Sequence, residues 1–373
     1  MKENTDKLAQ GRVVSIDVLR GFDMFWIIGG GAVFLRIFQL FDNPVSRTLA
    51  EQLEHAYWHG FHFQDLIFPL FLFIVGASIP FSLSKRLKCG DSRKKLYLHV
   101  IKRSLTLYIL GLIYYGLLDF NFAELRYVGV LPRIAACYFF TSLIVINTGI
   151  KGQVVWAGVL LIFYWALMML IPVPGFGAGV ITPEGNLSAY IDIRFLPGRF
   201  NHFGAYQFGD TTGLFGIVSA TVSTLLGVFA GHWLRSSYSQ IRKVQGLTLA
   251  GVVSLLIGLI WNFAFPINKH IWTSSFVLFA GGWCFLLLAL FFWIIDIRGC
   301  RKWAFPFIII GMNPITIYFL QGMFDFGIIA GIFVHGFIDN LGDFKPVFWE
   351  MCVLTVKWLF LYFLYKQKIF IKV

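Results

Sequence analysis

Ten long apolar runs, separated by shorter polar stretches, dominate the chain. Each run is close to the roughly 20 residues that a helix needs to cross the hydrocarbon core, and none alternates with the period of two expected of a barrel strand. Backbone groups in lipid must be hydrogen-bonded within the segment, so the runs are expected to be helices. The pattern predicts an all-α, polytopic transmembrane helical bundle that forms one domain over residues 1–373. The predicted spans lie near residues 14–40, 63–83, 98–118, 129–148, 154–172, 213–234, 245–265, 273–295, 303–324 and 347–366.

Charge placement tests this map. Lys and Arg gather in alternate connections, with nineteen on one side and six on the other. The six lie in the longer loops, so loop length does not explain the bias. By the positive-inside rule, the rich side is cytoplasmic, and both termini lie there. An even number of spans follows, and about ten fits. The short apolar stretch 326–338 is predicted to be a re-entrant or interfacial segment.

Composition agrees with a membrane protein, since 58% of residues are hydrophobic and only 13% are charged. The net charge of +12 is explained by orientation, so no nucleic-acid partner is expected. The five cysteines contain no CxxC pair, and neither a disulfide framework nor a cysteine metal site is indicated. Because the first apolar run carries Asp17, Arg20 and Asp23, it is expected to be retained rather than cleaved as a signal peptide.

The densest group of reactive side chains is His55-Ala-Tyr-Trp-His59-Gly-Phe-His62, followed by Asp65. On a helix, His55 and His59 would share a face. The spacing permits three interpretations. An interfacial aromatic belt is favoured by spacing alone. Two other interpretations are about equally favoured after it. One is a metal site completed by Glu51 or Glu54. The other is a catalytic histidine whose tautomer is fixed by Asp65 or Glu54.

Polar groups inside two other spans are candidates for binding. Asp17 and Arg20 are spaced to form an ion pair about two turns into the first span, where a structural role and a phosphate contact are equally favoured. Asn313 precedes Pro314 in the ninth run, a pattern typical of a broken helix. A third group, PINKHIWTSS at 266–275, places several hydrogen-bonding residues in one connection.

Six stretches together resemble the heparan-α-glucosaminide N-acetyltransferase family, particularly its shorter bacterial members of the DUF5009 type. They occur in the family's order and extend over most of the chain. The stretches are RVVSIDVLRGFDMFWII, HAYWHGFHFQDLIFPLFLFIVGASIPFSL, LRYVGVLPRIAACYF, GAGVITPEGNLSAYID, FPINKHIWTSSFVLFAGG and GMNPITIYF.

The resemblance implies a membrane acyltransferase that takes acetyl-CoA from the cytosol and acetylates an amino sugar, such as glucosamine, on the far side. It places the catalytic histidine at His55, with Asp65 beside it. The expected cofactor-binding residues are Arg20, Asp17, Asn313 and Arg133. The expected substrate-binding residues are His59, Asn268, Lys269, Trp272 and Ser274. The sequence departs from the family at His59, where an Asn is usual, and at Asp210-Thr211-Thr212-Gly213, where DPEG is often found.

Several expectations complete this picture. His55 acts either as a base or as an acetyl carrier, no metal is expected, and the protein resides in a bacterial inner membrane. The lipid bilayer is its main partner, and a homodimer is considered. Two alternatives stay open, namely a transporter of sugars or amino sugars and a zinc-dependent membrane hydrolase built on the histidines at 55–62.

Overall fold

A computed structural model describes residues 13–202 and 205–371. Within that part of the chain every regular element is helical, and β-structure is limited to two isolated bridges. The elements are α2 (Val14–Phe25), η1 (Trp26–Gly30), α3 (Gly31–Gln39), α4 (Pro44–Gln52), α5 (Phe63–Lys88), α6 (Arg93–Tyr114), η2 (Leu117–Asp119), α7 (Val130–Asn147), α8 (Ile150–Leu170), α9 (Leu187–Phe195), α10 (Ile217–Leu234), α11 (Gln240–Trp261), α12 (Ser274–Phe291), η3 (Phe292–Ile297), α13 (Phe305–Met312), α14 (Pro314–Met323), α15 (Phe326–Val334), η4 (Ile338–Phe344) and α16 (Lys345–Lys366).

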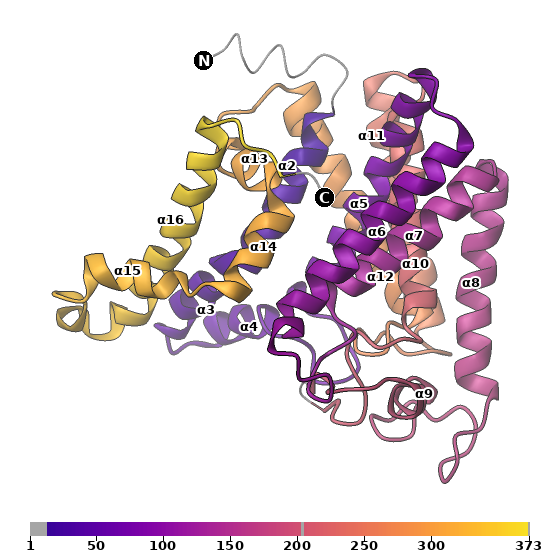
Figure 1. Ribbon diagram of the computed structural model, residues 1–373, viewed down its shortest axis with the longest axis horizontal. Helices are drawn as coiled ribbons and strands as arrows, with labels where there is room; N and C mark the ends of the chain where they lie inside the picture. Colours follow the sequence, from indigo (N-terminus) through magenta and orange to yellow (C-terminus); the bar gives the residue numbers. More distant parts are fainter. Residues whose placement is uncertain (1–12, 203–204, 372–373) are drawn as a thin grey trace.

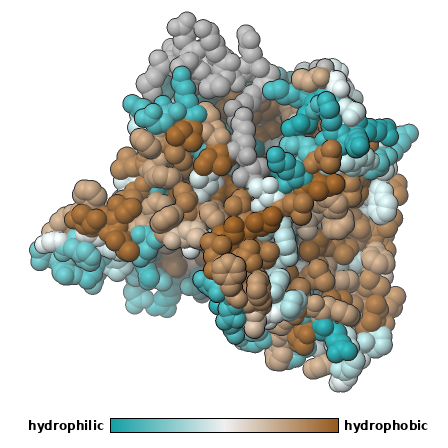
Figure 2. All heavy atoms as spheres, viewed as in Figure 1, coloured by the Kyte–Doolittle hydropathy of each residue, from teal (hydrophilic) through white to brown (hydrophobic). Residues whose placement is uncertain are grey.

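The predicted all-α bundle with about ten membrane-spanning helices is confirmed. Nine helices in the described ranges are long and apolar enough to cross a membrane, and the bent pair α13–α14 makes a tenth span if it is counted as one. Hydrophobic side chains cover the middle of the face seen in Figure 2, and hydrophilic ones gather toward its two ends. The stretch 326–338, too short for a span, forms the short helix α15 and the start of η4.

The ninth span is broken where the sequence indicates. The axes of α13 and α14 differ by 72°, with Asn313 at the break. Pro314 supplies no N–H and disfavours a helical conformation in the residue before it. The Asn313 amide donates to the Ile369 carbonyl at 3.0 Å and accepts from the Ile371 N–H at 2.9 Å. Asn313 therefore ties the broken span to the end of the chain.

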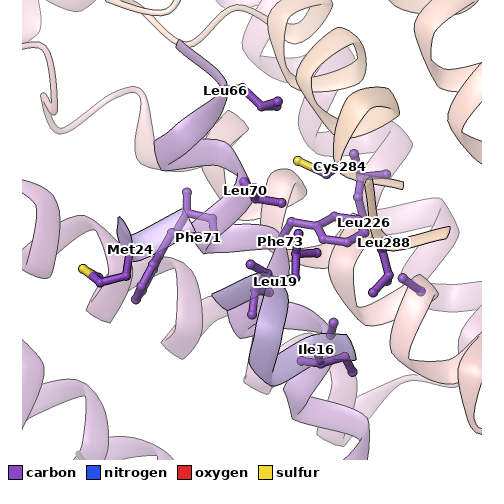
Figure 3. Close-up of a cluster of buried hydrophobic side chains, with 14 of the residues drawn as sticks. Ile16, Leu19, Met24, Leu66, Leu70, Phe71, Phe73, Leu226, Cys284 and Leu288 are labelled. Carbon is purple, nitrogen blue, oxygen red and sulfur yellow. The ribbon is translucent and has the colours of Figure 1, made fainter. Parts of the chain in front are cut away.

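The bundle is centred on α5 and α10, the two most buried spans at 72%, whereas only 22% of the apolar window of α6 and of α11 is buried. Glycines let the two central helices approach closely, because a Cβ added at Gly76 would lie only 1.9 Å from the Thr224 carbonyl oxygen. Leu70, Phe73, Leu226 and Leu288 belong to the buried core between these helices, α2 and α12 (Figure 3). Small residues at such crossings are typical of helices packed in lipid.

The helices α13 to α16 form a group of their own, at the left in Figure 1. It joins the rest of the bundle mainly through α2 and α3, which pack on α13 and α16. We name the two ends of the bundle by their connections. The "loop end" carries residues 40–62, 115–129, 171–216 and 262–273, and the "basic end" carries residues 89–92, 148–149, 235–239 and 298–304.

Candidate active site

The histidine-rich segment is irregular rather than helical. Residues 53–62 connect α4 to α5 at the loop end and follow no helical path. The possibility that His55 and His59 share a helix face is therefore wrong. Gly60 has a φ of +119°, which interrupts a helix, and its N–H donates to the Ile267 carbonyl at 2.9 Å instead of to a helical neighbour. The segment is held by the connection at 262–273.

His55 and Asp65 form a hydrogen-bonded pair, with 2.7 Å between His55 Nδ1 and Asp65 Oδ1. Asp65 lies in the first turn of α5, and its side chain is 1% exposed. Its Oδ2 accepts from the N–H groups of Ala56 at 3.2 Å and His62 at 2.9 Å. The carboxylate is thus fixed by backbone donors and by the helix N-terminus. Its Oδ1 holds the Nδ1–H tautomer of His55, so that Nε2 is the acceptor nitrogen of the ring.

Lys269 joins this pair from the 262–273 connection. Its Nζ lies 2.8 Å from each of the two ring nitrogens of His55 and 3.6 Å from Asp65 Oδ1. Burial lowers the pKa of Lys269 to about 8, although the carboxylate of Asp65 opposes this change. A lysine with such a pKa exchanges its proton close to neutral pH.

The same surroundings keep His55 neutral. Burial lowers the pKa of His55 below its usual value, the hydrogen bond to Asp65 raises it, and the charge of Lys269 lowers it again. Burial also lowers the pKa of the neighbouring His270 to about 4. The Nε2 atom of His270 is 3.1 Å from the Ala56 carbonyl, and its ring stacks on Trp58 with centroids 5.5 Å apart. His270 therefore supports the segment that carries His55.

A cavity of about 230 Å³ opens in front of His55 and Lys269. Its other walls come from distant parts of the chain, namely Gln64 and Phe68 of α5, Arg126, Thr211 and Thr212 of two connections, Trp272, and Tyr318 of α14. The site thus offers a neutral imidazole, an ammonium group and apolar walls within one enclosed space. A nucleophile could be deprotonated there, and a developing negative charge could be stabilised.

One wall of the cavity is an ion pair. Arg126 Nε and Nη2 donate to the two carboxylate oxygens of Asp210 at 2.7 and 2.6 Å, and Nη2 also donates to Thr212 Oγ1 at 2.9 Å. Burial would raise the pKa of Asp210, but the bonds and charge of Arg126 outweigh it and hold that pKa below its usual range. The Asp192 side chain of α9 accepts from the Asp210 N–H at 3.2 Å and so helps to fix the backbone of Asp210.

The predicted substrate-binding residues divide into two groups. Lys269 and Trp272 line the cavity beside His55. Trp272 has a left-handed φ of 53°, uncommon for a bulky residue, and Ser219 and Ser223 hold it through hydrogen bonds of 2.6 and 3.2 Å. The other predicted residues face elsewhere. Asn268 lies 3.4 Å from exposed His59, and Ser274 donates to the Leu161 carbonyl at 2.8 Å.

The four predicted cofactor-binding residues do not meet in one place. Arg20 of α2 donates to Asp17 at 3.1 Å and to Ser78 of α5 at 2.9 Å. Asn313 bonds to the end of the chain, as described above. Arg133 of α7 is buried beside the cavity, 4.9 Å from the Trp272 ring centroid, and donates to the Gly213 carbonyl at 3.0 Å. Arg133 thus lies close to the His55 site. Asp17 and Arg20 instead lie within α2, and Arg20 contacts α5 at Ser78.

Comparison with known proteins identifies relatives over almost the whole chain. A family model described as a domain of unknown function, DUF5009, matches residues 12–118. Two curated proteins named heparan-alpha-glucosaminide N-acetyltransferase are similar as well. The one from Homo sapiens is 26% identical over 97% of this chain, and the one from Mus musculus is 27% identical over 86% of it. Over most of its length, the chain is thus similar to proteins named heparan-alpha-glucosaminide N-acetyltransferase. It spans about 60% of the length of the human relative and 56% of that of the mouse relative.

The DUF5009 match contains only half of the site. Residues 12–118 include His55 and Asp65, while Lys269, Arg126 and Asp210 lie beyond them. Arg126 and Asp210 were missed as functional candidates by sequence reasoning. Two signals could have identified Arg126. It is one of only six Lys and Arg residues in the connections predicted to be non-cytoplasmic, and it lies one turn before the span that carries Arg133.

The second interpretation of the histidine segment was a metal site. In the part of the chain that the structure describes, no three His, Cys, Asp or Glu side chains are placed to hold a metal ion together. His62 instead places Nδ1 3.0 Å from the Glu54 carbonyl oxygen. The geometry at His55 matches the third interpretation, in which a carboxylate orients one histidine.

Proposed function

We propose that this chain is a membrane-embedded acetyltransferase that moves an acetyl group from acetyl-CoA to the amine of glucosamine or of a short amino sugar. The observation that carries the proposal is the His55–Asp65 pair, which faces a cavity beside Lys269. The names of the relatives support the reaction class, and the enclosed site supports a small acceptor. The cytosolic source of acetyl-CoA, an acceptor on the far side and a bacterial inner membrane all belong to the proposal.

The proposed chemistry needs a base, because an amine attacks a thioester only in its neutral form. His55 Nε2 takes the proton from the attacking amine while Asp65 holds Nδ1–H. The nitrogen forms a bond to the acetyl carbonyl carbon, and the carbon–sulfur bond breaks. The leaving thiolate of CoA then receives the proton that His55 holds. The products are an N-acetyl sugar and CoA thiol, and His55 returns to its neutral form.

Lys269 serves this reaction in two ways. Its charge lowers the pKa of His55 and thereby keeps the imidazole in the basic form near neutral pH. Its ammonium group also lies at the cavity wall, where it can stabilise the oxyanion of the tetrahedral intermediate. We therefore extend its role from binding substrate to stabilising the transition state. Trp272 bounds the acceptor side, with Arg133 packed against its ring. Asp17 and Arg20 lie along the route that we propose for the pantetheine arm from the basic end.

The test is release of CoA thiol by protein purified in detergent, with acetyl-CoA as donor and with or without glucosamine. The proposal expects thiol release that depends on the acceptor, together with N-acetylglucosamine identified by mass spectrometry. Absence of thiol release across a panel of amino sugars would contradict it. Accumulation of unmodified sugar in vesicles without acetyl-CoA would identify a transporter instead.

The pH profile is expected to report the charge at Lys269. The acid limb of kcat/KM in the wild type should have its midpoint below 6.5, because burial lowers the pKa of His55. An alkaline limb near pH 8 should follow loss of the Lys269 proton. In Lys269→Met the acid midpoint should rise, since a cation that lowers the pKa of His55 is gone, and the enzyme's alkaline limb should disappear.

The matched control for this profile is Lys345→Met, which removes an exposed lysine at the start of α16. Titration of the acceptor amine is common to all three proteins and cancels in their comparison. An acid midpoint that is identical in wild type and Lys269→Met would show that Lys269 does not act on His55.

A further inference from the structure

A second cavity, with polar and apolar walls, lies at the basic end of the bundle, away from His55. It has a volume of about 660 Å³ and is enclosed by the ends of α5, α7 and α10 and the starts of α6 and α8. Pro80 in its wall is fifteen residues beyond Asp65 on α5, which corresponds to about 22 Å along the helix axis. The cavity is therefore separate from the proposed catalytic site.

Gln153 lines this cavity and has a buried acceptor without a partner among the described residues. The residue is only 2% exposed, and its Nε2 donates to the Thr148 carbonyl at 3.0 Å. That bond fixes the orientation of the amide, and Oε1 is buried with no hydrogen-bond partner among the described residues. A buried acceptor without a donor costs free energy. A ligand that brings an N–H or O–H group to this atom would remove the cost.

The rest of the cavity attracts an anion. Arg93 and Arg235 line it, and the helices α6 and α8 begin there with their positive dipole ends. Arg235 is held in place by hydrogen bonds to the Pro80 carbonyl at 2.8 Å and to Ser84 Oγ at 2.5 Å. Asp91, in the connection before α6, pairs with Arg86 and is not part of the lining. The positive charges of Arg93 and Arg235 can therefore interact with an anionic ligand in the cavity.

Apolar side chains form the remaining wall. They include Leu83, Leu96 and Ile146. Leu87 and Ile150, 56% and 55% exposed, stand at its edge, and the exposed Val154 continues the apolar surface along α8. A soluble anion would leave this surface uncovered in water or against lipid. A ligand with a charged head and hydrocarbon chains would satisfy both parts of the site.

We propose that this cavity binds the head group of a glycerophospholipid whose phosphate is accompanied by a hydrogen-bond donor. The phosphate lies between Arg93 and Arg235 at the two helix starts, and an amine or hydroxyl of the head group donates to Gln153 Oε1. The acyl chains lie along α8. A soluble nucleotide could supply phosphate and amine chemistry too, but the continuous apolar wall favours the lipid.

The experiment compares lipids retained by the protein after reconstitution in equal parts of phosphatidylcholine, phosphatidylethanolamine and phosphatidylglycerol. Bound lipid is counted by native mass spectrometry. Phosphatidylcholine has the phosphate but lacks an N–H or O–H donor in its head group. We expect the wild type to retain the other two lipids about tenfold better, since one hydrogen bond in a charged site corresponds to about one decade.

Two variants separate the parts of the site. Gln153→Leu should lose the preference while still binding lipid, and Arg93→Gln should lower retention of all three lipids by about tenfold. Lys94→Gln is the matched control, because it removes the neighbouring charge of the same helix start but does not line the cavity. Thermal unfolding is recorded for each variant, and Gln153→Met replaces Gln153→Leu if the latter fails to fold.

Equal retention of the three lipids by the wild type, or an unchanged preference in Gln153→Leu, would overturn the proposal. Loss of bound lipid when CoA is added would overturn it too, by assigning the phosphate site to the nucleotide. The measurement uses neither acetyl donor nor acceptor. Its outcome is therefore independent of the proposed acetyl transfer.

Discussion

Replacement of His55 by alanine is expected to lower the rate of acetyl transfer by about 10²- to 10⁴-fold, the range that a positioned general base contributes. The imidazole faces the cavity with Nδ1 held by Asp65 at 2.7 Å. No other imidazole is placed to replace it in the described ranges, because His270, which also lines the cavity, has its pKa lowered to about 4 by burial. The rate is measured as glucosamine-dependent release of CoA thiol.

His62→Ala is the matched control for this variant. His62 lies in the same connecting segment, but its side chain is placed against the Glu54 carbonyl and does not line the cavity. We expect its activity to stay near that of the wild type. Full activity in a correctly folded His55→Ala protein would refute the proposed mechanism.

The same pair of proteins separates the two roles considered for His55. If His55 carries the acetyl group, wild-type protein mixed with acetyl-CoA in the absence of sugar should release one burst of thiol and hold an acetyl-imidazole, whereas His55→Ala should not. If His55 is only a base, neither protein should release thiol until the amine is present. Rapid quenching followed by mass spectrometry of the intact protein distinguishes these outcomes.

The number and order of the spans could be predicted because the bilayer demands long apolar helices. Their boundaries could not, since apolarity marks the depth of a residue and not the extent of its hydrogen bonding. The third span was predicted at 98–118, yet α6 starts at Arg93. Ser92 caps that start by accepting from the Lys95 N–H at 3.4 Å, so the basic residues after it are helical.

The local part of the site was predictable, and its long-range part was not. His55 and Asp65 are ten residues apart, and the proposal that a carboxylate orients the histidine needed only that proximity. Arg126 and Asp210 are 84 residues apart, and their pairing depends on how two connections fold at the loop end. Asn313 was expected near the cofactor, but it bonds to Ile369 and Ile371. Nothing in the sequence around it indicates that partner.

Breaking the ion pair between Arg126 and Asp210 is expected to cost about 3–5 kcal/mol, because either single substitution leaves one buried charge without its partner. The two side chains are 9% and 0% exposed. Asp210→Asn removes the charge and keeps only one acceptor oxygen, whereas in the wild type the Asn201 N–H donates to Oδ2 and the Thr212 N–H to Oδ1, each at 2.8 Å, so one of these hydrogen bonds is lost as well. The measurement is the thermal unfolding midpoint in detergent at a fixed heating rate.

The double variant Arg126→Met/Asp210→Asn decides whether charge or packing is responsible. With both charges removed, neither is left unpaired, so the double variant should unfold at a higher temperature than the single variants imply by addition. Asp339→Asn, which breaks an exposed pair with Lys345, should leave the midpoint unchanged. The pKa of Asp210 is lowered in the folded protein, so the stabilisation is present above the ordinary aspartate range and is lost as pH falls through the folded value. The gap between wild type and Asp210→Asn should accordingly persist at neutral pH and close only in acid. A double variant no more stable than the sum of its parts would show that the two side chains act by filling space around the cavity.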